Sequence, residues 1–169
     1  MPIRVRPATD ADVRGFAAWS YDPPYDVYDT RMDPDDAVDY FLGSDIHCHV
    51  LVDGDDVVGY CTFGQDAQVP GGDYEGEGLD MGLGVKPSRT GSGDGHQFIA
   101  AVVAYATETF EPRQLRVTIA AGNRRALRAW SGAGFTEVSR FGSAPEVMGS
   151  TEFVVLVCEA NRRVQGGRV

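Results

Sequence analysis

The residues of segment 79–98 are the ones whose types and spacing best suggest chemistry. An apolar run that ends at Val85 is followed by a turn with glycine at 91, 93 and 95, and then by a segment with helical periodicity. Alternating glycines at a strand-to-helix turn let the backbone approach a ligand closely. The first N–H groups of the helix lack internal partners, and with the helix dipole they attract an anion. The turn therefore predicts a phosphate site, with a ligand-free glycine loop as the alternative.

Two other glycine motifs do not fit this turn. A Walker A loop ends in Gly-Lys-Ser/Thr, whereas Gly95 is followed by His96. A dinucleotide-binding fingerprint needs glycine three places after Gly93, where His96 again stands. Both motifs are therefore excluded.

The turn resembles that of the GNAT N-acetyltransferase superfamily, in which a strand ending in Val-x-Pro precedes a Gln/Arg-x-x-Gly-x-Gly/Ala turn. Thr90 stands where the family has Gln or Arg, and the neighbouring Arg89 could compensate. The resemblance implies that amides of the turn hold the diphosphate of acetyl-CoA and that the preceding strand pairs with the pantetheine arm. The cofactor-binding residues predicted in these segments are Leu83, Gly84, Val85, Arg89, Thr90, Gly91, Ser92, Gly93, Asp94, Gly95 and His96.

Segment 123–135 resembles the family's Asn-x-x-Ala-x-x-x-Tyr-x-x-x-Gly-Phe segment. The resemblance implies that Asn123 contacts the CoA arm, and a helix N-cap is the structural alternative, which can hold at the same time. Trp130 replaces the family's Tyr, whose hydroxyl often protonates the departing thiolate; an indole N–H cannot serve as an acid near neutral pH. Arg128 belongs to a group that could meet the CoA 3′-phosphate or be solvated: Arg113, Arg116, Arg124, Arg125 and Arg128.

Asp80 is the candidate catalytic base. In the family's mechanism a free amine attacks the thioester, and a base removes its proton directly or through water. Asp80 lies in the fourth predicted strand, but the family's usual base would fall at Leu79 or Met81, on the opposite face. A strand bulge would correct the register, and without one Asp80 would be structural. Glu75 and Glu77 could act through a water.

The acceptor pocket is expected between the N-terminal helices and the loop 65–78. Trp19, Tyr25 and Tyr28, with Asp22, Asp26, Asp29 and Tyr21 around them, form an aromatic and acidic segment. This composition suits a cationic amine through cation–π and charge attraction. The alternative is that the aromatics pack against the sheet and the aspartates are solvated. The expected acceptor is a small-molecule or peptide amine.

The elements that must position these residues follow from periodicity and turn chemistry. Strands are predicted at 3–6, 49–52, 57–63, 79–85, 115–120, 135–141 and 152–159, and helices at 11–19, 35–42, 96–110 and 123–132. With the resemblance, this order predicts one α/β domain of the GNAT fold over residues 1–160. Its seven-stranded, mostly antiparallel sheet would be flanked by about four helices, and a polar tail would follow at 161–169.

Composition narrows the function classes. The chain has 169 residues and a formal net charge of −10, which would repel nucleic acids and anionic membranes and favour cationic partners. No apolar run reaches the ~20 residues of a membrane span, and no signal peptide is recognised, so a cytoplasmic protein is expected. Three scattered cysteines predict no disulfide framework. His47 and His49 have no third ligand nearby in sequence, so no metal site is expected.

Two functions from different classes are compatible with these residues. The first is an acetyl-CoA-dependent N-acetyltransferase that works in a ternary complex; dimers are common in the resembling family. The second is a non-catalytic acyl-CoA-binding or sensor domain of the same fold, which Trp130 and the register of Asp80 favour. The enzyme is preferred because proximity alone supplies much of the rate. Segments 19–25, 67–72 and 79–84 also resemble a GNAT subgroup without a defined acceptor, which supports the fold and the cofactor only.

Overall fold

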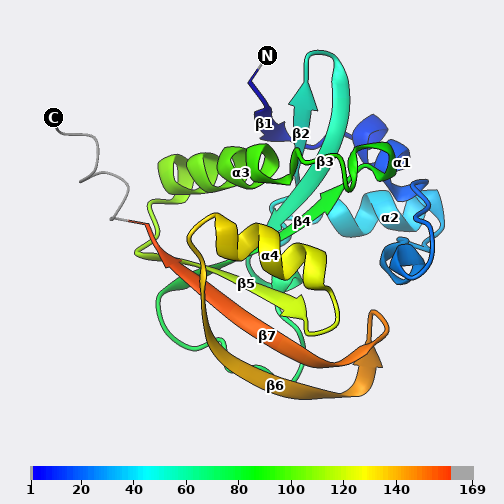
Figure 1. The fold of residues 1–169 in the computed structure, drawn as a ribbon. Helices are drawn as coiled ribbons and strands as arrows, with labels where there is room; N and C mark the ends of the chain where they lie inside the picture. The colour runs from blue at the N-terminus through cyan, green and yellow to red at the C-terminus, as the bar shows by residue number, and fades with distance from the viewer. Residues whose placement is uncertain (1, 161–169) are drawn as a thin grey trace, which may run out of the picture.

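The fold is that of a computed structural model, which describes residues 2–160; the predicted tail at 161–169 lies outside them. The helices and strands follow the predicted order (Figure 1). They are β1 (Arg4–Pro7), α1 (Asp10–Ala17), α2 (Pro34–Phe41), β2 (His49–Asp53), β3 (Asp56–Phe63), β4 (Gly78–Val85), α3 (Gly95–Phe110), β5 (Gln114–Ala120), α4 (Arg124–Gly132), β6 (Thr136–Val147) and β7 (Ser150–Glu159). Short 3-10 turns lie at Tyr25–Tyr28, Gln65–Ala67 and Pro87–Arg89.

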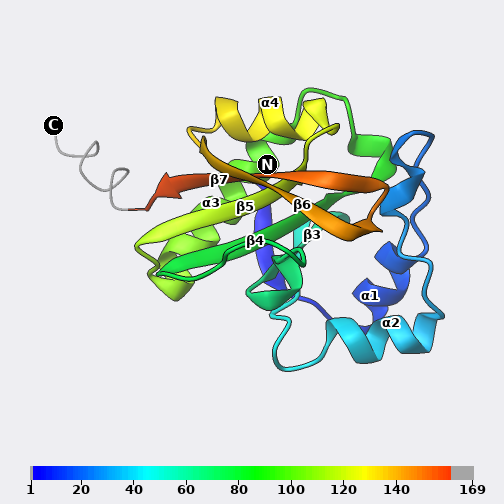
Figure 2. The ribbon, with the colours of Figure 1, turned by 90° about the horizontal axis from the view of Figure 1, so that it is seen from below.

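The strands form one seven-stranded sheet in the order β1-β2-β3-β4-β5-β7-β6. Every neighbouring pair is antiparallel except β4 and β5, which are parallel. Helices α3 and α4 pack on one face, and α1 and α2 pack on the other (Figures 1 and 2). The predicted fold is confirmed. Within residues 2–160, no helix has the length and apolarity that crossing a bilayer requires.

Each of the two N-terminal helices begins one residue before its predicted start, directly after a capping residue. Thr9 caps α1, and its hydroxyl and the Asp12 carboxylate form a reciprocal capping box. Asp33 caps α2, which has a proline at its first position. Buried Phe16 and Phe41 from these helices then pack edge to face, with ring centroids 5.0 Å apart. This pair anchors both helices to the sheet.

Helix α3 is held by an apolar stripe of helical period. Its buried side chains are Phe98, Ile99, Val102, Val103 and Ala106. They pack against the face of β4 that carries Leu79, Met81, Leu83 and Val85. Full burial of a large apolar side chain contributes about 1.5–3 kcal/mol. This stripe therefore fixes where the N-terminus of α3 meets the end of β4.

One strand pair is longer than the sequence indicates. Strand β6 extends from Thr136 to Val147 rather than ending near 141, and β7 begins at Ser150. Gly142 and Pro145 argue against a strand there, but β6 is an edge strand, where glycine and proline are tolerated. A register shift in the β6–β7 pairing lies in this segment, between Gly142 and Val147.

The feature that matters most for function is a fork between β4 and β5. The two strands pair only where Gly78–Asp80 faces Gln114–Arg116. Beyond this point β5 continues against β7, and among the described residues no strand pairs with residues 81–85 of β4 on the β5 side (Figure 2). The fork leaves one backbone edge of β4 open at the centre of the sheet.

Candidate functional site

The open edge of β4 presents alternate backbone groups. Lys86 N–H donates to the Val58 carbonyl, and Gly64 N–H donates to the Asp80 carbonyl, so the even-numbered residues of β4 pair with β3. Because backbone groups alternate along a strand, those of Met81, Leu83 and Val85 point into the fork. Leu83 and Val85 therefore present strand-edge positions to the fork, and their role in cofactor binding stays a prediction.

Gly84 differs from the prediction, because its backbone pairs with Tyr60 of β3 rather than facing the fork. Gly84 instead leaves room for a neighbouring side chain, because it has no Cβ. A Cβ at position 84 would lie 2.3 Å from Cε1 of Tyr60. The Tyr60 ring in turn stacks on Phe16, with ring centroids 4.1 Å apart. The missing side chain thus lets α1 approach the sheet behind the fork.

The glycine turn after β4 forms a cradle of free amides. Gly91 and Gly93 have φ angles of +68° and +87°, which favour glycine. Within residues 2–160, no hydrogen bond uses the N–H groups of residues 91–96. Gly95 opens α3 with its Cβ position 4.0 Å from Ala129, so α3 and α4 approach closely here. A diphosphate fits this geometry, because unpaired amides at a helix N-terminus bind anions.

Side chains around the cradle mostly stabilise the turn itself. Thr90 Oγ1 donates to the Pro87 carbonyl at 2.7 Å. Ser92 Oγ lies 2.8 Å from the Arg89 carbonyl, and His96 Nδ1 lies 2.9 Å from the Gly93 carbonyl. Arg89 pairs with Asp53 and Asp94 at 3.2 and 3.4 Å, so its charge is already engaged.

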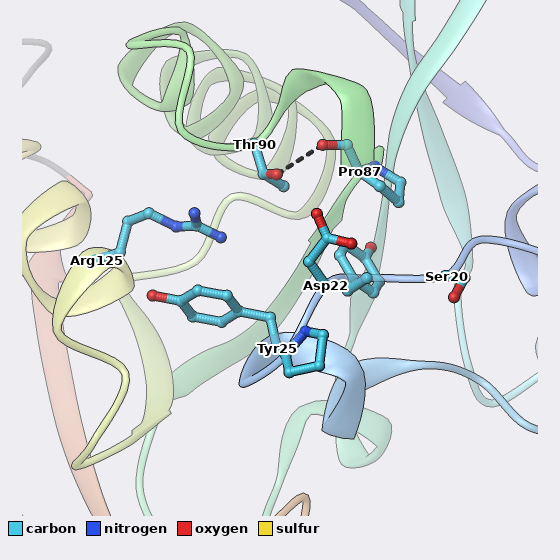
Figure 3. Close-up of a pocket in the computed structure, with 8 residues that line it drawn as sticks. Ser20, Asp22, Tyr25, Pro87, Thr90 and Arg125 are labelled. Carbon is cyan, nitrogen blue, oxygen red and sulfur yellow. Dashed lines mark hydrogen bonds between the residues drawn. The ribbon is translucent and has the colours of Figure 1, made fainter.

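A pocket of about 240 Å³ lies beside the cradle (Figure 3). It is bounded by the segment after α1, by the turn after β4 and by α4. The lining residues are Ser20, Tyr21, Asp22, Pro23, Tyr25, Pro87, Thr90 and Arg125. The pocket thus combines a carboxylate, a guanidinium and phenol groups next to the predicted phosphate site.

The segment 20–29, which we call the strap, connects both arms of the fork. Tyr21 Oη donates to the Val85 carbonyl of β4 at 2.7 Å, and burial raises the pKa of Tyr21 to about 12, so the hydroxyl remains a donor at neutral pH. Tyr28 Oη accepts from Asn123 Nδ2 at 3.1 Å, just after β5. The Tyr25 ring lies 4.1 Å from the Arg125 guanidinium carbon. The strap thus closes the mouth of the fork.

The predicted substrate-binding aromatics therefore separate into two groups. Trp19 packs against Phe16 and Tyr60 on the sheet, as expected if it is a packing residue rather than a substrate-binding one. Tyr25 lines the pocket, and Tyr28 contacts Asn123. Tyr21 joins them as a residue that the prediction named only among the neighbours of the site.

The three predicted cofactor-binding residues at helix α4 lie in three different environments. Asn123 Oδ1 accepts from Ala126 N–H at 3.2 Å, so Asn123 is the N-cap. Trp130 is 5% exposed and packs edge to face on Phe135 within the core, so it does not line the pocket beside the cradle. Arg128 is exposed on the helix surface, and its role stays a prediction.

Asp80 lies in a buried ion pair. Its carboxylate accepts two hydrogen bonds from Arg116, at 2.5 and 2.8 Å, and one from Gln68 Nε2 at 2.8 Å. Asp80 and Arg116 also form the last register pair before the fork opens. The β3–β4 register runs without a shift, so no bulge moves Asp80 to the face of Leu79 and Met81. The base role of Asp80 stays a prediction, and its geometry is that of an anchor.

The ion pair also changes the expectation for Arg116 and its neighbours. Arg116 is buried against Asp80, and its hydrogen bond with that carboxylate raises the guanidinium pKa. Arg113 pairs with Glu77 at 3.0 Å on the surface. Glu75 uses its carbonyl oxygen to accept from Arg116. Neither Arg113 nor Arg116 is therefore free to meet a phosphate.

His49 and two of the three cysteines serve packing. His49 is buried against Phe63 and Tyr105, and this burial lowers its pKa. Its Nδ1 lies 2.7 Å from the His47 carbonyl. Cys48 and Cys61 are free and buried. Within residues 2–160, no three His, Cys, Asp or Glu side chains are grouped to hold a metal ion.

Sequence reasoning named Arg125 only within a group of five arginines, and it predicted neither the contact of Gln68 nor the pairing of Arg116 with Asp80. Arg125 carried a signal, because it stands on the helix that follows the Asn123 motif. Gln68 carried none, since its contact depends on how the loop after β3 returns over the sheet. The Arg116 pairing could have been found from a basic and an acidic residue at matching places in two predicted strands.

Comparison with known proteins gives the family. The model described as an acetyltransferase (GNAT) domain matches residues 3–136. Among curated proteins, no sequence matches the chain. Among solved structures, a spermidine N-acetyltransferase from Vibrio cholerae in complex with CoA and spermine is 12% identical, with a TM-score of 0.77 over 96% of this chain and 98% of that one.

Two further structures share the fold. The aminoglycoside acetyltransferase AAC(6')-Ib, in complex with ribostamycin and coenzyme A, is 18% identical, with a TM-score of 0.76 over 99% of this chain and 100% of that one. A structure described as a phosphinothricin N-acetyltransferase is 19% identical, with a TM-score of 0.69 over 93% of this chain and 98% of that one. The family model covers most of the chain, so the protein belongs to the GNAT family.

Proposed function

We propose that the protein transfers the acetyl group of acetyl-CoA to a primary amine of a small molecule, by direct attack in a ternary complex. The observation that carries this proposal is the free amide cradle at residues 91–96 beside the open edge of β4. Together they offer donors for a diphosphate and a strand edge for an extended arm.

The chain's own groups would hold acetyl-CoA along this line. The amides of 91–96 would bind the diphosphate, and Leu83 and Val85 would pair with the pantetheine arm. Bound acetyl-CoA supplies an acetyl thioester that an amine can attack. N–H groups on the edge of β4 would stabilise charge on a carbonyl oxygen, because fixed backbone dipoles need no reorganisation.

The remaining rate would come from holding the amine near the thioester. Well-oriented reactants gain up to ~7–11 kcal/mol from proximity. The Asp80 carboxylate is already engaged by hydrogen bonds from Arg116 and Gln68. We therefore assign Asp80 to the geometry of the fork and the amine proton to solvent water.

The acceptor would enter from the side of the strap. Asp22 lines the pocket there, and Asp29 Oδ1 accepts from the Tyr21 N–H at 2.9 Å. Carboxylates at an entrance favour a cationic amine through charge attraction. Polyamines and aminoglycosides are the first acceptors to test, since fold neighbours are named for both.

The test is thiol release from acetyl-CoA with polyamines, aminoglycosides, amino acids and short peptides, alongside calorimetric binding of acetyl-CoA. We expect binding without any amine and release with one class of amine. Binding without release from any amine would support a non-catalytic acyl-CoA sensor instead. Absence of binding would overturn the cofactor assignment.

A matched pair of variants connects binding to the cradle. Gly93 and Gly76 have φ angles of +87° and +97°, and a Cβ at either position would meet nothing within 4 Å. Gly93→Ala and Gly76→Ala therefore impose similar backbone strain, but only Gly93 lies in the cradle. We expect Gly93→Ala to weaken acetyl-CoA binding at least tenfold and Gly76→Ala to leave it unchanged. Equal losses in both variants would attribute the effect to strain alone.

A further inference from the structure

Arg125 lies directly beside the glycine cradle. It stands in the first turn of α4, and its Nη1 atom is 3.5 Å from the position that a Cβ of Gly91 would occupy. Its guanidinium also lines the pocket with Pro87 and Thr90 (Figure 3). A side chain at position 91 would fill the space between Arg125 and the turn. The glycine thus leaves Arg125 access to whatever the amides bind.

The Tyr25 ring fixes the direction of this guanidinium. The Arg125 guanidinium carbon lies 4.1 Å from the ring centroid, a cation–π distance. Figure 3 shows Tyr25 and Arg125 extending toward each other, one from the strap and one from α4. Such a platform reduces the conformational entropy that a long side chain loses when it binds a ligand.

Apart from its cation–π contact with Tyr25, the charge of Arg125 has no ion-pair partner within the part of the chain that the structure describes. None of the ion pairs between the described residues includes Arg125, although Asp22 lines the same pocket. Arg89, the nearest other arginine of the turn, pairs with Asp53 and Asp94. Arg125 is therefore the cation that this site can give to an anion.

We propose that Arg125, held by Tyr25, is a specificity-determining residue that binds the diphosphate of the CoA nucleotide beside the amide cradle. This inference rests on the proposed function. A guanidinium offers a planar set of donors that matches phosphate oxygens. It supplies the charge that Thr90 and the engaged Arg89 do not, and it compensates locally for a net charge of −10. Tyr25 then belongs to the cofactor side rather than to the acceptor pocket.

The test measures CoA binding by calorimetry in Arg125→Gln, with circular dichroism as the check of folding. We expect CoA affinity to fall about tenfold to a hundredfold, the size of a lost charge-assisted hydrogen bond. Tyr25→Leu should weaken binding several-fold in the same direction. Arg113→Gln is the matched control, because it removes one positive charge from the surface pair with Glu77 and should leave binding unchanged.

Ligand variants identify which phosphate Arg125 contacts. Dephospho-CoA retains the diphosphate and lacks the 3′-phosphate, so we expect Arg125→Gln to lose as much affinity for it as for CoA. S-acetylpantetheine has no diphosphate and should bind both proteins equally. A loss that disappears with dephospho-CoA would assign Arg125 to the 3′-phosphate and overturn the proposal, as would unchanged CoA binding. If the unmodified protein binds no CoA, the proposed function fails first.

Discussion

At the scale of single residues, the buried ion pair of Asp80 and Arg116 determines which charges at the centre of the site are available for chemistry. The two side chains are 4% and 7% exposed, and they join β4 to β5 at the last paired position before the fork. Charges this deeply buried persist only when paired, because desolvation would otherwise cost several kcal/mol. The carboxylate is therefore explained by structure before any catalytic role is assigned.

The substitution Asp80→Asn distinguishes a structural role of Asp80 from a role as catalytic base. Because it leaves the Arg116 charge buried without a counterion, we expect a loss of about 3–5 kcal/mol in the free energy of unfolding, measured by urea denaturation. Asp80→Asn combined with Arg116→Gln should recover part of that loss. For the folded fraction, the pH profile of kcat/KM should keep its shape. An acid limb that vanishes in Asp80→Asn, with stability unchanged, would show that Asp80 is the base.

At the scale of elements, the strap and the fork form one unit. Tyr21 connects the segment after α1 to Val85 at the end of β4, and Tyr28 connects it to Asn123, the N-cap of α4. The Tyr21 hydroxyl occupies the carbonyl of Val85, which is one of the groups that face the fork. A ligand that pairs with this edge of β4 has to displace that hydroxyl.

Tyr21→Phe should therefore strengthen acetyl-CoA binding. It removes a competing hydrogen bond whose net contribution is about 0.5–1.5 kcal/mol, so calorimetry should show a gain of about twofold to tenfold. Tyr40→Phe is the control, because its hydroxyl bonds to Asp66 rather than to the fork. Weaker binding in Tyr21→Phe would mean that the hydroxyl contacts the ligand instead of competing with it.

At the scale of the whole molecule, charge is the dominant feature. The chain has 25 acidic and 15 basic residues, so the folded state carries a net repulsion. Several ion pairs of the described residues join two exposed side chains, and such pairs contribute about 0–1 kcal/mol each. Salt weakens both the net repulsion and the attraction within the surface ion pairs, and we expect the net repulsion to be the larger energy.

Sodium chloride should therefore raise the thermal unfolding midpoint. Between 0.01 and 0.2 M the Debye length falls from about 30 Å to below 10 Å, so most of the gain should occur in this range. A rise of about 2–4 °C corresponds to about 1 kcal/mol for a chain of this size. A midpoint that falls with salt would show that the surface ion pairs outweigh the repulsion.

The sequence by itself determined the order of the elements and the glycine cradle. Periodicity and caps such as Thr9 and Asp33 act over a few residues, so they can be read locally. The same holds for the turn at 91–95, because its glycines allow the φ angles that the turn needs.

Only the tertiary structure decided which side chains meet across the fork. The engagement of Asp80, the free charge of Arg125 beside Gly91, the core position of Trp130 and the bond from Tyr21 to Val85 all join segments far apart in the chain. Such contacts depend on strand register and on the path of loops over the sheet, and no local pattern encodes either. The sequence therefore determined where a cofactor could bind, and the fold decided which residues are free to bind it.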